Sequence, residues 1–423
     1  MNEKRGTSMN FVKEYNCDVA IVGGGVAGCA AAVEAARAGK SVLLIEKSTQ
    51  LGGLATIGLV NLFVPMCNGR GTRIIRGMAE EFLQLAIRYG WDCIPSDWQN
   101  GEPGQGNTTQ RMVSRFSPAI FALALCELLD ELGVQILFDT VLTGVDGGAG
   151  GIGHLILFNK SGYSCARAKV YIDASGDADL CAMAGAPTVT RGNFHSYFPL
   201  AATLESCQKA VEKQDIAHLT LNVRRSGGNA SLFGERHPEG KPLWDGTNGE
   251  DVTRYLVENQ RQLLNNIKDE DRKSRDLTCI PIMPQFRTTR CLVGNATLRE
   301  EDVYRHCEDS ICAINDFEFR DRLFEVPYGV MVRDGFDDLL AVGRCASGEG
   351  YGWDVLRVIP PAILTGQAAG AAAVQAMARG VGVTAVDVKA LQEQLAKEDV
   401  MIHFDDALIP PSETKESVDV GEA

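Results

Sequence analysis

Three glycines near the start of the chain have the spacing of a phosphate-binding turn. Gly23, Gly25 and Gly28 form G-x-G-x-x-G directly after the apolar run 17–22. In this pattern the first glycine allows a tight turn, the second leaves room for a pyrophosphate, and the third lets a helix pack closely on a strand. The N–H groups and the positive end of the helix dipole then face the phosphates. The spacing therefore predicts a dinucleotide site.

Glu46 supplies the second part of that site. It closes the apolar run 41–45, and a carboxylate about 20 residues after the glycines accepts hydrogen bonds from ribose hydroxyls. Since the acid is Glu and no Arg follows it, a plain adenosine ribose is expected rather than a 2′-phosphate. A bare glycine-rich turn is the alternative, and the succession of strand, helix, strand and acid over 17–47 argues against it.

Hydrophobic periodicity and turn residues predict the elements that position this site. Strands are expected over 17–22, 41–45, 134–138, 141–145, 169–172 and 339–344, and helices over 29–38, 75–89, 118–132, 251–268 and 362–377. A second G-x-G-x-x-G over 148–153 is rejected as a nucleotide site, because a strand follows it and no helix N-terminus is available. Thr297 is expected to cap a short helix with Glu300 at its third position. The long loop 91–109 is expected to be functional or mobile.

Composition limits the function classes. The chain has 423 residues and a net charge of −14, which argues against bulk binding to nucleic acid or to an anionic membrane. The thirteen cysteines contain no C-x-x-C, a pattern that favours reduced thiols over a disulfide framework. Cys67 and Cys345 are expected to be buried and inert. No run is long enough to span a bilayer, and a cytoplasmic protein is the expectation.

Several motifs in a fixed order resemble one family. They are GGGVAGCAAAVEAARAGKSVLLIEK, LGGLAT, DASGDADLCAMAGAP, FRTTRCLVGNATLREED, LLAVGRCAS and RVIPPAILTGQAAGAAA, and they cover about 18–380. The combination resembles the FAD-dependent oxidoreductases of the glutathione-reductase structural class. The resemblance implies an α/β fold of the glutathione-reductase type, an FAD/NAD(P)-binding fold with a parallel sheet and a β-meander, plus an inserted α+β cap domain. The expected units are a flexible leader 1–16, an FAD-binding domain 17–184 and 324–382, a cap 185–323, and an extension 383–423 with a disordered tail.

The resemblance also implies roles for individual residues around FAD. Gly23, Gly25 and Gly28 would contact the pyrophosphate, Glu46 the adenosine ribose, and Val141 the adenine. Gly53 would lie beside the ribityl chain, and Gly343 and Arg344 at the diphosphate and ribityl end. Ala174, Gly176 and Asp177 would line the cleft, and Gly366, Gln367 and Ala368 would approach the flavin ring. Further cofactor-binding residues are expected at Val26, Ala27, Lys47, Gly52, Leu54 and Ala55. Two positions depart from the family pattern. The usual R-E-T-R-R is Arg287-Thr288-Thr289-Arg290-Cys291, and Arg344 stands where many relatives carry an acid.

The leading hypothesis is an enzyme in which FAD exchanges a hydride with a small, anionic organic substrate under the cap. Arg290 and Arg357, with Arg287, would clamp a carboxylate, because Arg pairs with planar anions through two parallel hydrogen bonds. The alternative is that these arginines bridge the cap to acids of the main domain. Trp353 would face the flavin or pack in the core. No metal site is predicted.

Two other functions stay open. One is an FAD-bearing component of an RNA-modifying assembly, since the opening motif also resembles tRNA-modifying flavoproteins. The other is a non-catalytic nucleotide-binding module. NAD(P)H or a separate electron carrier would be the second redox partner, no nucleic acid or membrane partner is expected, and the oligomeric state is open.

Overall fold

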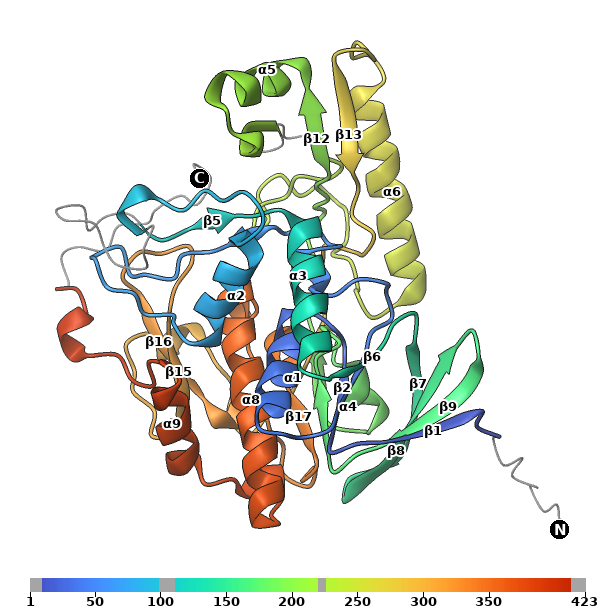
Figure 1. Cartoon of the computed structure of the whole chain (residues 1–423). Helices are drawn as coiled ribbons and strands as arrows, with labels where there is room; N and C mark the ends of the chain where they lie inside the picture. The colour runs from blue at the N-terminus through green and yellow to red at the C-terminus, as the bar shows by residue number, and fades with distance from the viewer. Residues whose placement is uncertain (1–9, 99–110, 220–225, 412–423) are drawn as a thin grey trace.

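A parallel five-stranded sheet forms the centre of the molecule. The computed structural model describes residues 10–98, 111–219 and 226–411 (Figure 1). The strand order is β17-β10-β2-β3-β6, all parallel, with bounds β17 Leu339–Ala341, β10 Val170–Asp173, β2 Val19–Val22, β3 Val42–Ile45 and β6 Gln135–Leu137. Strands β2, β3 and β10 are buried along their whole length, as expected for a parallel sheet covered on both faces. The predicted α/β fold with a parallel sheet is confirmed.

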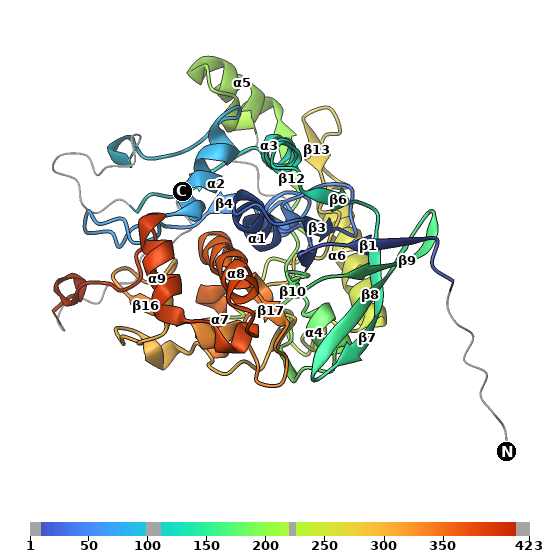
Figure 2. The ribbon, with the colours of Figure 1, turned by 60° about the horizontal axis from the view of Figure 1, so that its bottom comes forward.

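Helices rich in small residues cover the sheet. Helix α1 (Val26–Arg37) and helix α8 (Ile359–Arg379) lie side by side (Figure 2). A Cβ added to Gly366 would meet the carbonyl oxygen of Ala27 at 2.1 Å, so the close approach of the two helices requires glycine there. Helices α2 (Met78–Ile87) and α3 (Pro118–Glu131) pack on the same core. Ser117 caps α3 by accepting from the N–H of Ile120, as its position before Pro118 predicts.

A second sheet has the order β1-β9-β8-β7, with β7, β8 and β9 antiparallel and β1 parallel to β9. The bounds are β1 Lys13–Asn16, β7 Val141–Gly148, β8 Gly151–Asn159 and β9 Gly162–Arg167. The turn between β7 and β8 is the second glycine motif, so its assignment to a hairpin is confirmed. The prediction of a flexible leader over 1–16 is wrong for its last residues, because β1 pairs with β9 and Tyr15 is buried.

The region after β10 forms smaller units. Its elements are α4 Asp179–Met183, β11 Thr188–Thr190 paired with β14 Arg290–Leu292, β12 Leu200–Thr203 paired with β13 Arg275–Cys279, α5 Leu204–Lys213 and α6 Gly249–Ile267. Figure 1 shows β12, β13, α5 and the upper part of α6 projecting to one side of the parallel sheet. An apolar cluster of its own holds this part together, with Tyr197, Trp244, Tyr255, Leu263 and Phe286 buried.

The chain returns to the main core earlier than predicted. Strands β15 (Ser310–Asn315) and β16 (Leu323–Pro327) form one antiparallel hairpin whose residues belong to the core of α1 and α8. The predicted boundary between the cap and the second part of the FAD-binding domain, at residue 323, therefore falls inside this hairpin and is wrong. Helix α9 (Val388–Lys397) ties the C-terminal extension to the core, whereas the predicted disordered tail lies from 412 onward outside the described residues. Part of the predicted loop 91–109 also lies outside them.

Short elements complete the chain. They are β4 Leu62–Phe63, β5 Ser114–Arg115, α7 Gly350–Leu356 and the 3₁₀ turns η1 Gly53–Ala55, η2 Ser96–Trp98, η3 Ile216–Leu219, η4 Glu300–Asp302, η5 Tyr328–Val330, η6 Gly343–Cys345, η7 Val383–Ala385 and η8 Asp406–Leu408. The predicted cap at Thr297 is wrong, because Arg299 occupies the cap of η4 and the Thr297 hydroxyl bonds the Ser347 hydroxyl instead. Within the described ranges, no helix is both long and apolar enough to cross a membrane.

Candidate functional site

A cleft of about 420 Å³ opens beside the central strands. It follows the carboxyl ends of β2, β3, β10 and β17, where open α/β sheets bind ligands. Most residues predicted for the cofactor line it, namely Gly23, Gly25, Val26, Ala27, Glu46, Lys47, Gly52, Gly53, Leu54, Val141, Ala174, Gly176, Gly343 and Arg344. Residues 22–57 thus supply one part of the lining, and later segments at 140–142, 174–176, 179, 282–284, 342–344, 357 and 362 supply the rest.

The N-terminus of α1 points into this cleft without a capping side chain. Gly25 is the N-cap, with φ −66°, and a Cβ added to it would meet no atom within 4 Å. Gly23 instead has φ +104°, and a Cβ on Gly28 would lie 2.0 Å from the Gly23 carbonyl oxygen. Gly28 and Gly23 therefore shape the turn, and Gly25 keeps open space in front of free helix N–H groups. An anion such as a diphosphate fits this end of the helix.

Glu46 borders the same space with a rigidly held carboxylate. One oxygen accepts from the N–H of Gly24 at 2.7 Å and the other from the N–H of Ser48 at 2.7 Å. A carboxylate has about four acceptor positions, so each oxygen keeps one for a ligand. The arrangement fits a pair of ribose hydroxyls.

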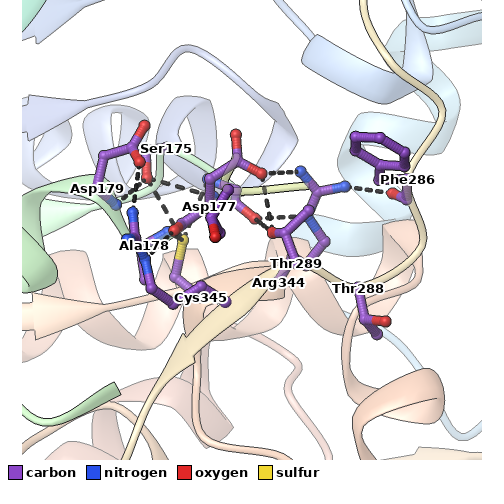
Figure 3. A network of polar contacts seen from close by, with 12 residues as sticks. Ser175, Asp177, Ala178, Asp179, Phe286, Thr288, Thr289, Arg344 and Cys345 are labelled. Atoms are coloured by element: carbon purple, nitrogen blue, oxygen red, sulfur yellow. Dashed lines mark hydrogen bonds and ion pairs between the residues drawn. The ribbon is translucent and has the colours of Figure 1, made fainter. Parts of the chain in front are cut away.

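Arg344, which lines the cleft, and Asp177 belong to a network of polar contacts (Figure 3). The Arg344 guanidinium donates to Asp177 Oδ1 at 2.8 Å and to the carbonyl oxygens of Gly176 and Phe286. Thr289 Oγ1 donates to the same Asp177 oxygen at 2.9 Å. These bonds join the loop after β10 to the segment 286–289. Asp177 serves this network and does not line the cleft, which corrects its predicted place on the wall.

Further arginines gather behind Arg344. Arg357 lines the cleft and is paired with Asp354 at 2.7 Å, and Arg191 pairs with the other oxygen of Asp354 at 2.8 Å. Burial, and then repulsion by Arg357, lowers the pKa of Arg287 to about 10. Burial also lowers the pKa of Arg357, despite Asp354. This part of an acidic protein thus holds more guanidinium groups than carboxylates.

Two predicted catalytic residues lie elsewhere. Arg290 does not line the cleft; it bonds Asp179 at 2.7 Å and the carbonyl oxygen of Asp177, so it bridges elements of the protein. Trp353 is buried, and its indole N–H donates to the carbonyl oxygen of Arg344 at 3.0 Å. The structure therefore favours the alternatives of a bridging arginine and a core tryptophan. Arg287 donates to the carbonyl oxygens of Ser231 and Ala230, which is also a structural use.

The segment 366–368 does not reach the cleft. Gly366 packs on α1, and Ala368 is fully buried in the core. The Gln367 side chain accepts from the N–H of Met78 and donates to Glu398. The expectation that these residues meet a flavin is wrong in this structure, because α8 turns its small residues toward α1. Ala362, near the start of α8, lines the cleft instead. Ala55, which was predicted to contact the cofactor, is buried and does not line the cleft.

Three residues that the sequence analysis missed come from the projecting region. Ile282, Met283 and Pro284 line the cleft, and the N–H of Ile282 bonds the carbonyl oxygen of Ile57 at 3.0 Å. Ile282 is 71% exposed, which is unusual for a large apolar side chain next to a cavity. Its flanking prolines, Pro281 and Pro284, were the available signal for an extended segment.

The cysteines have no redox arrangement. All thirteen are free. Cys345 is buried, its sulfur accepts from the N–H groups of Gly176 and Ala178, and burial raises its pKa well above the usual range. Burial likewise raises the pKa of Cys67 to about 11. Neither thiol is set up to react as a thiolate.

One family profile matches most of this chain. A profile of the family described as FAD dependent oxidoreductase matches residues 18–197 and 214–395. The glutamate synthase [NADPH] small chain of Bacillus subtilis (strain 168) is 31% identical over 173 residues, which are 40% of this chain and 30% of that protein. The chain thus matches less than a third of the length of that relative.

Solved structures resemble the whole chain more distantly. A geranylgeranyl bacteriochlorophyll reductase-like protein from Thermoplasma acidophilum has 16% identity and a TM-score of 0.45, over 92% of this chain and 85% of that one. The p-nitrophenol 4-monooxygenase PnpA from Pseudomonas putida DLL-E4 has 12% identity and a TM-score of 0.48, over 93% and 91%.

Proposed function

Since the chain belongs to the family of FAD-dependent oxidoreductases, we propose that its cleft binds FAD for a hydride exchange with a small, anionic organic substrate. One observation carries the proposal. The uncapped N-terminus of α1 faces the cleft, and Glu46, Arg344 and Arg357 line the same cleft. These groups suit a ligand that combines a ribose, a diphosphate and a redox group next to an anion.

Each part of FAD would be bound by a different group of residues in the cleft. The N–H groups at the start of α1 bind the diphosphate, and Gly25 leaves the room that this contact needs. Glu46 receives hydroxyl groups of the adenosine ribose, with Lys47 and Val141 beside it. FAD supplies a ring that takes up or gives back two electrons with a proton. The protein orients this ring and keeps water away from it.

The balance of charge supports an anionic substrate. Arg191, Arg287, Arg344 and Arg357 influence one another, and Asp177 and Asp354 are the carboxylates bonded to them. Four guanidinium groups against two carboxylates leave a positive surplus in a chain of net charge −14. Arg344 and Arg357 both line the cleft. Arg344 already donates to Asp177 and to two carbonyl oxygens, so Arg357 is proposed to take over the clamping role expected of Arg290. A carboxylate bound there would offset the cost of burying this surplus.

The projecting region between β11 and β14 is proposed to act as the cap. Its segment 282–284 borders the cleft, and its bonds to Ile57 and Gly58 hold it there. The parallel sheet with the antiparallel strands β7, β8 and β9 supports assignment to the glutathione-reductase type. NAD(P)H or a separate electron carrier would complete the reaction. The RNA-modifying alternative is not carried forward, because the net charge opposes a polyanionic partner.

The test starts from the purified protein. The released cofactor, identified by mass spectrometry, should be FAD at one per chain, and neither FMN nor NAD should replace it after removal. Anaerobic mixing with small metabolites should bleach the visible flavin band for at least one organic acid. A protein that retains no FAD on reconstitution refutes the site. A flavin that no metabolite or NAD(P)H can reduce would support the non-catalytic module instead.

A further inference from the structure

Two histidines and a glutamate from three separate segments meet around β16, and none of them lines the cleft. His306 follows η4, Glu325 lies within β16, and His403 lies before η8. The atoms that each could offer to a metal ion all lie within 4.8 Å of one another. We propose that His306, Glu325 and His403 form a binding site for a divalent transition metal ion, with Zn²⁺ as the ion that fits best.

The donor set and its spacing carry the proposal. Imidazole nitrogen and carboxylate oxygen are ligands that zinc prefers, and three protein ligands with a water complete its tetrahedron. Zinc–ligand bonds of about 2.1 Å put neighbouring donors ~3.4 Å apart in a tetrahedron. His306 Nδ1 lies 2.6 Å from Glu325 Oε1, and His403 Nδ1 lies 2.9 Å from Glu325 Oε2. Both nitrogens already point at the carboxylate, and the distance from each nitrogen to its carboxylate oxygen would lengthen by less than an ångström around an ion.

The side chains differ in the freedom that such an adjustment needs. The Glu325 side chain is fully buried, whereas the two histidine side chains are 44% and 46% exposed. Glu325 is also fixed by the N–H groups of Cys307 at 2.8 Å and Phe404 at 3.3 Å. The carboxylate is thus held rigidly, and the two histidine side chains lie at the surface, where an ion from solvent can reach them.

Asp406 supports one of the ligands from behind. Its Oδ1 lies 2.9 Å from Nε2 of His306, the ring nitrogen that faces away from Glu325. Histidines that bind metals usually donate their second N–H to such a carboxylate, which fixes the ring and raises its basicity. This second carboxylate distinguishes His306 from a surface histidine that merely bonds one acid.

A metal ion here would join the C-terminal extension to the core. His403 and Asp406 belong to the extension, and Glu325 belongs to the hairpin β15–β16. On binding, Zn²⁺ would replace the protons shared between the imidazole Nδ1 atoms and the carboxylate, and these protons would pass to the buffer. The ion would stabilise the folded chain, because the unfolded chain does not hold the three ligands together.

The experiment uses the full-length protein, freed of metal by a chelator and then titrated with ZnCl₂ in a calorimeter. The variants are His403→Gln, the double variant His306→Gln/His403→Gln, and Glu325→Gln. His218→Gln is the matched control, since His218 Nε2 lies 3.9 Å from Asp215 Oδ2, outside the cluster. Circular dichroism and melting without metal check that each variant folds. The double variant changes only half-exposed side chains, so the test does not depend on Glu325→Gln folding.

We expect one Zn²⁺ per wild-type chain with proton release, and a higher melting temperature with the ion. Each single variant should bind at least tenfold more weakly, the double variant should lose the site, and His218→Gln should match wild type. Absence of saturable binding to the wild type would overturn the proposal and leave a hydrogen-bonded cluster. Binding of unchanged affinity in the double variant would overturn it too, because groups outside the cluster, such as the exposed thiols of Cys93 and Cys207, would then hold the ion.

Discussion

Replacing Gly25 by valine separates FAD binding from folding. A Cβ at this position meets no protein atom within 4 Å, and the φ of −66° suits any residue. The apo protein should therefore lose at most about 1 kcal/mol, the usual cost of an apolar N-cap. In the holo protein the branched side chain occupies the space reserved for the diphosphate and covers N–H groups of α1. Loss of two charge-assisted hydrogen bonds, each about 1.5–3 kcal/mol, should weaken FAD binding at least 100-fold.

Gly28→Ala is the contrasting variant. Its Cβ would lie 2.0 Å from the Gly23 carbonyl oxygen, so even one methyl group forces strand and helix apart. We expect an apo protein destabilised by about 3 kcal/mol or more, since overpacked cores of this kind cannot relax freely. Fluorescence titration with FAD measures the affinity, and urea unfolding of the apo forms measures stability. A Gly25→Val protein that binds FAD like wild type would refute the assignment of the diphosphate to α1.

Three further outcomes are expected. Arg357→Met should retain FAD and lower kcat/KM for an anionic substrate by 10- to 100-fold, which corresponds to about 1.5–3 kcal/mol of transition-state stabilisation. Arg290→Met should chiefly lower the melting temperature. Equal turnover by Arg357→Met and wild type would disprove the clamp. Alkylation without reductant, followed by mass spectrometry, should find all thirteen thiols free, and a stoichiometric Cys–Cys crosslink would contradict this. Burial, and then the nearby Glu398, raises the pKa of Glu34 from the ordinary 4.5 to about 7, so the folded chain holds a proton that the unfolded chain loses. The contribution of this proton to the free energy of unfolding is fully present below pH 4.5 and is lost as the pH rises through 7. This contribution is at most ~3 kcal/mol. Between pH 5 and 8 the melting temperature should fall more for wild type than for Glu34→Gln. An equal fall in both proteins would show that Glu34 does not titrate in this range.

Features encoded by adjacent residues were predictable from the sequence. The turn at Gly23–Gly28, the acid at Glu46 and the cap at Ser117 each depend on a few neighbouring residues, and the structure agrees with them. The hairpin at 148–151 could be predicted because a strand, not a helix, follows its glycines. Local pattern therefore accounts for most of one wall of the cleft.

Features that depend on pairing across the chain were missed. Arg290 is a residue type that can bind the carboxylate of a substrate. In the structure it already binds the carboxylate of Asp179, which lies more than a hundred residues earlier in the chain. Trp353 donates its N–H to a neighbouring loop, which no spacing reveals. The cluster of His306, Glu325 and His403 likewise has no sequence motif, because its members come from three separate segments with irregular spacing.

The central claim is that a flavin in this cleft reacts with an anionic substrate. The most direct measurement is the anaerobic absorption spectrum of the FAD-loaded protein, mixed with organic acids and, for each acid, its neutral amide or ester. The account predicts that one or more acids bleach the flavin band and that the matched neutral compounds do so far more slowly, with Arg357→Met removing the difference. Bleaching by neutral or cationic compounds in preference to the acids would contradict it.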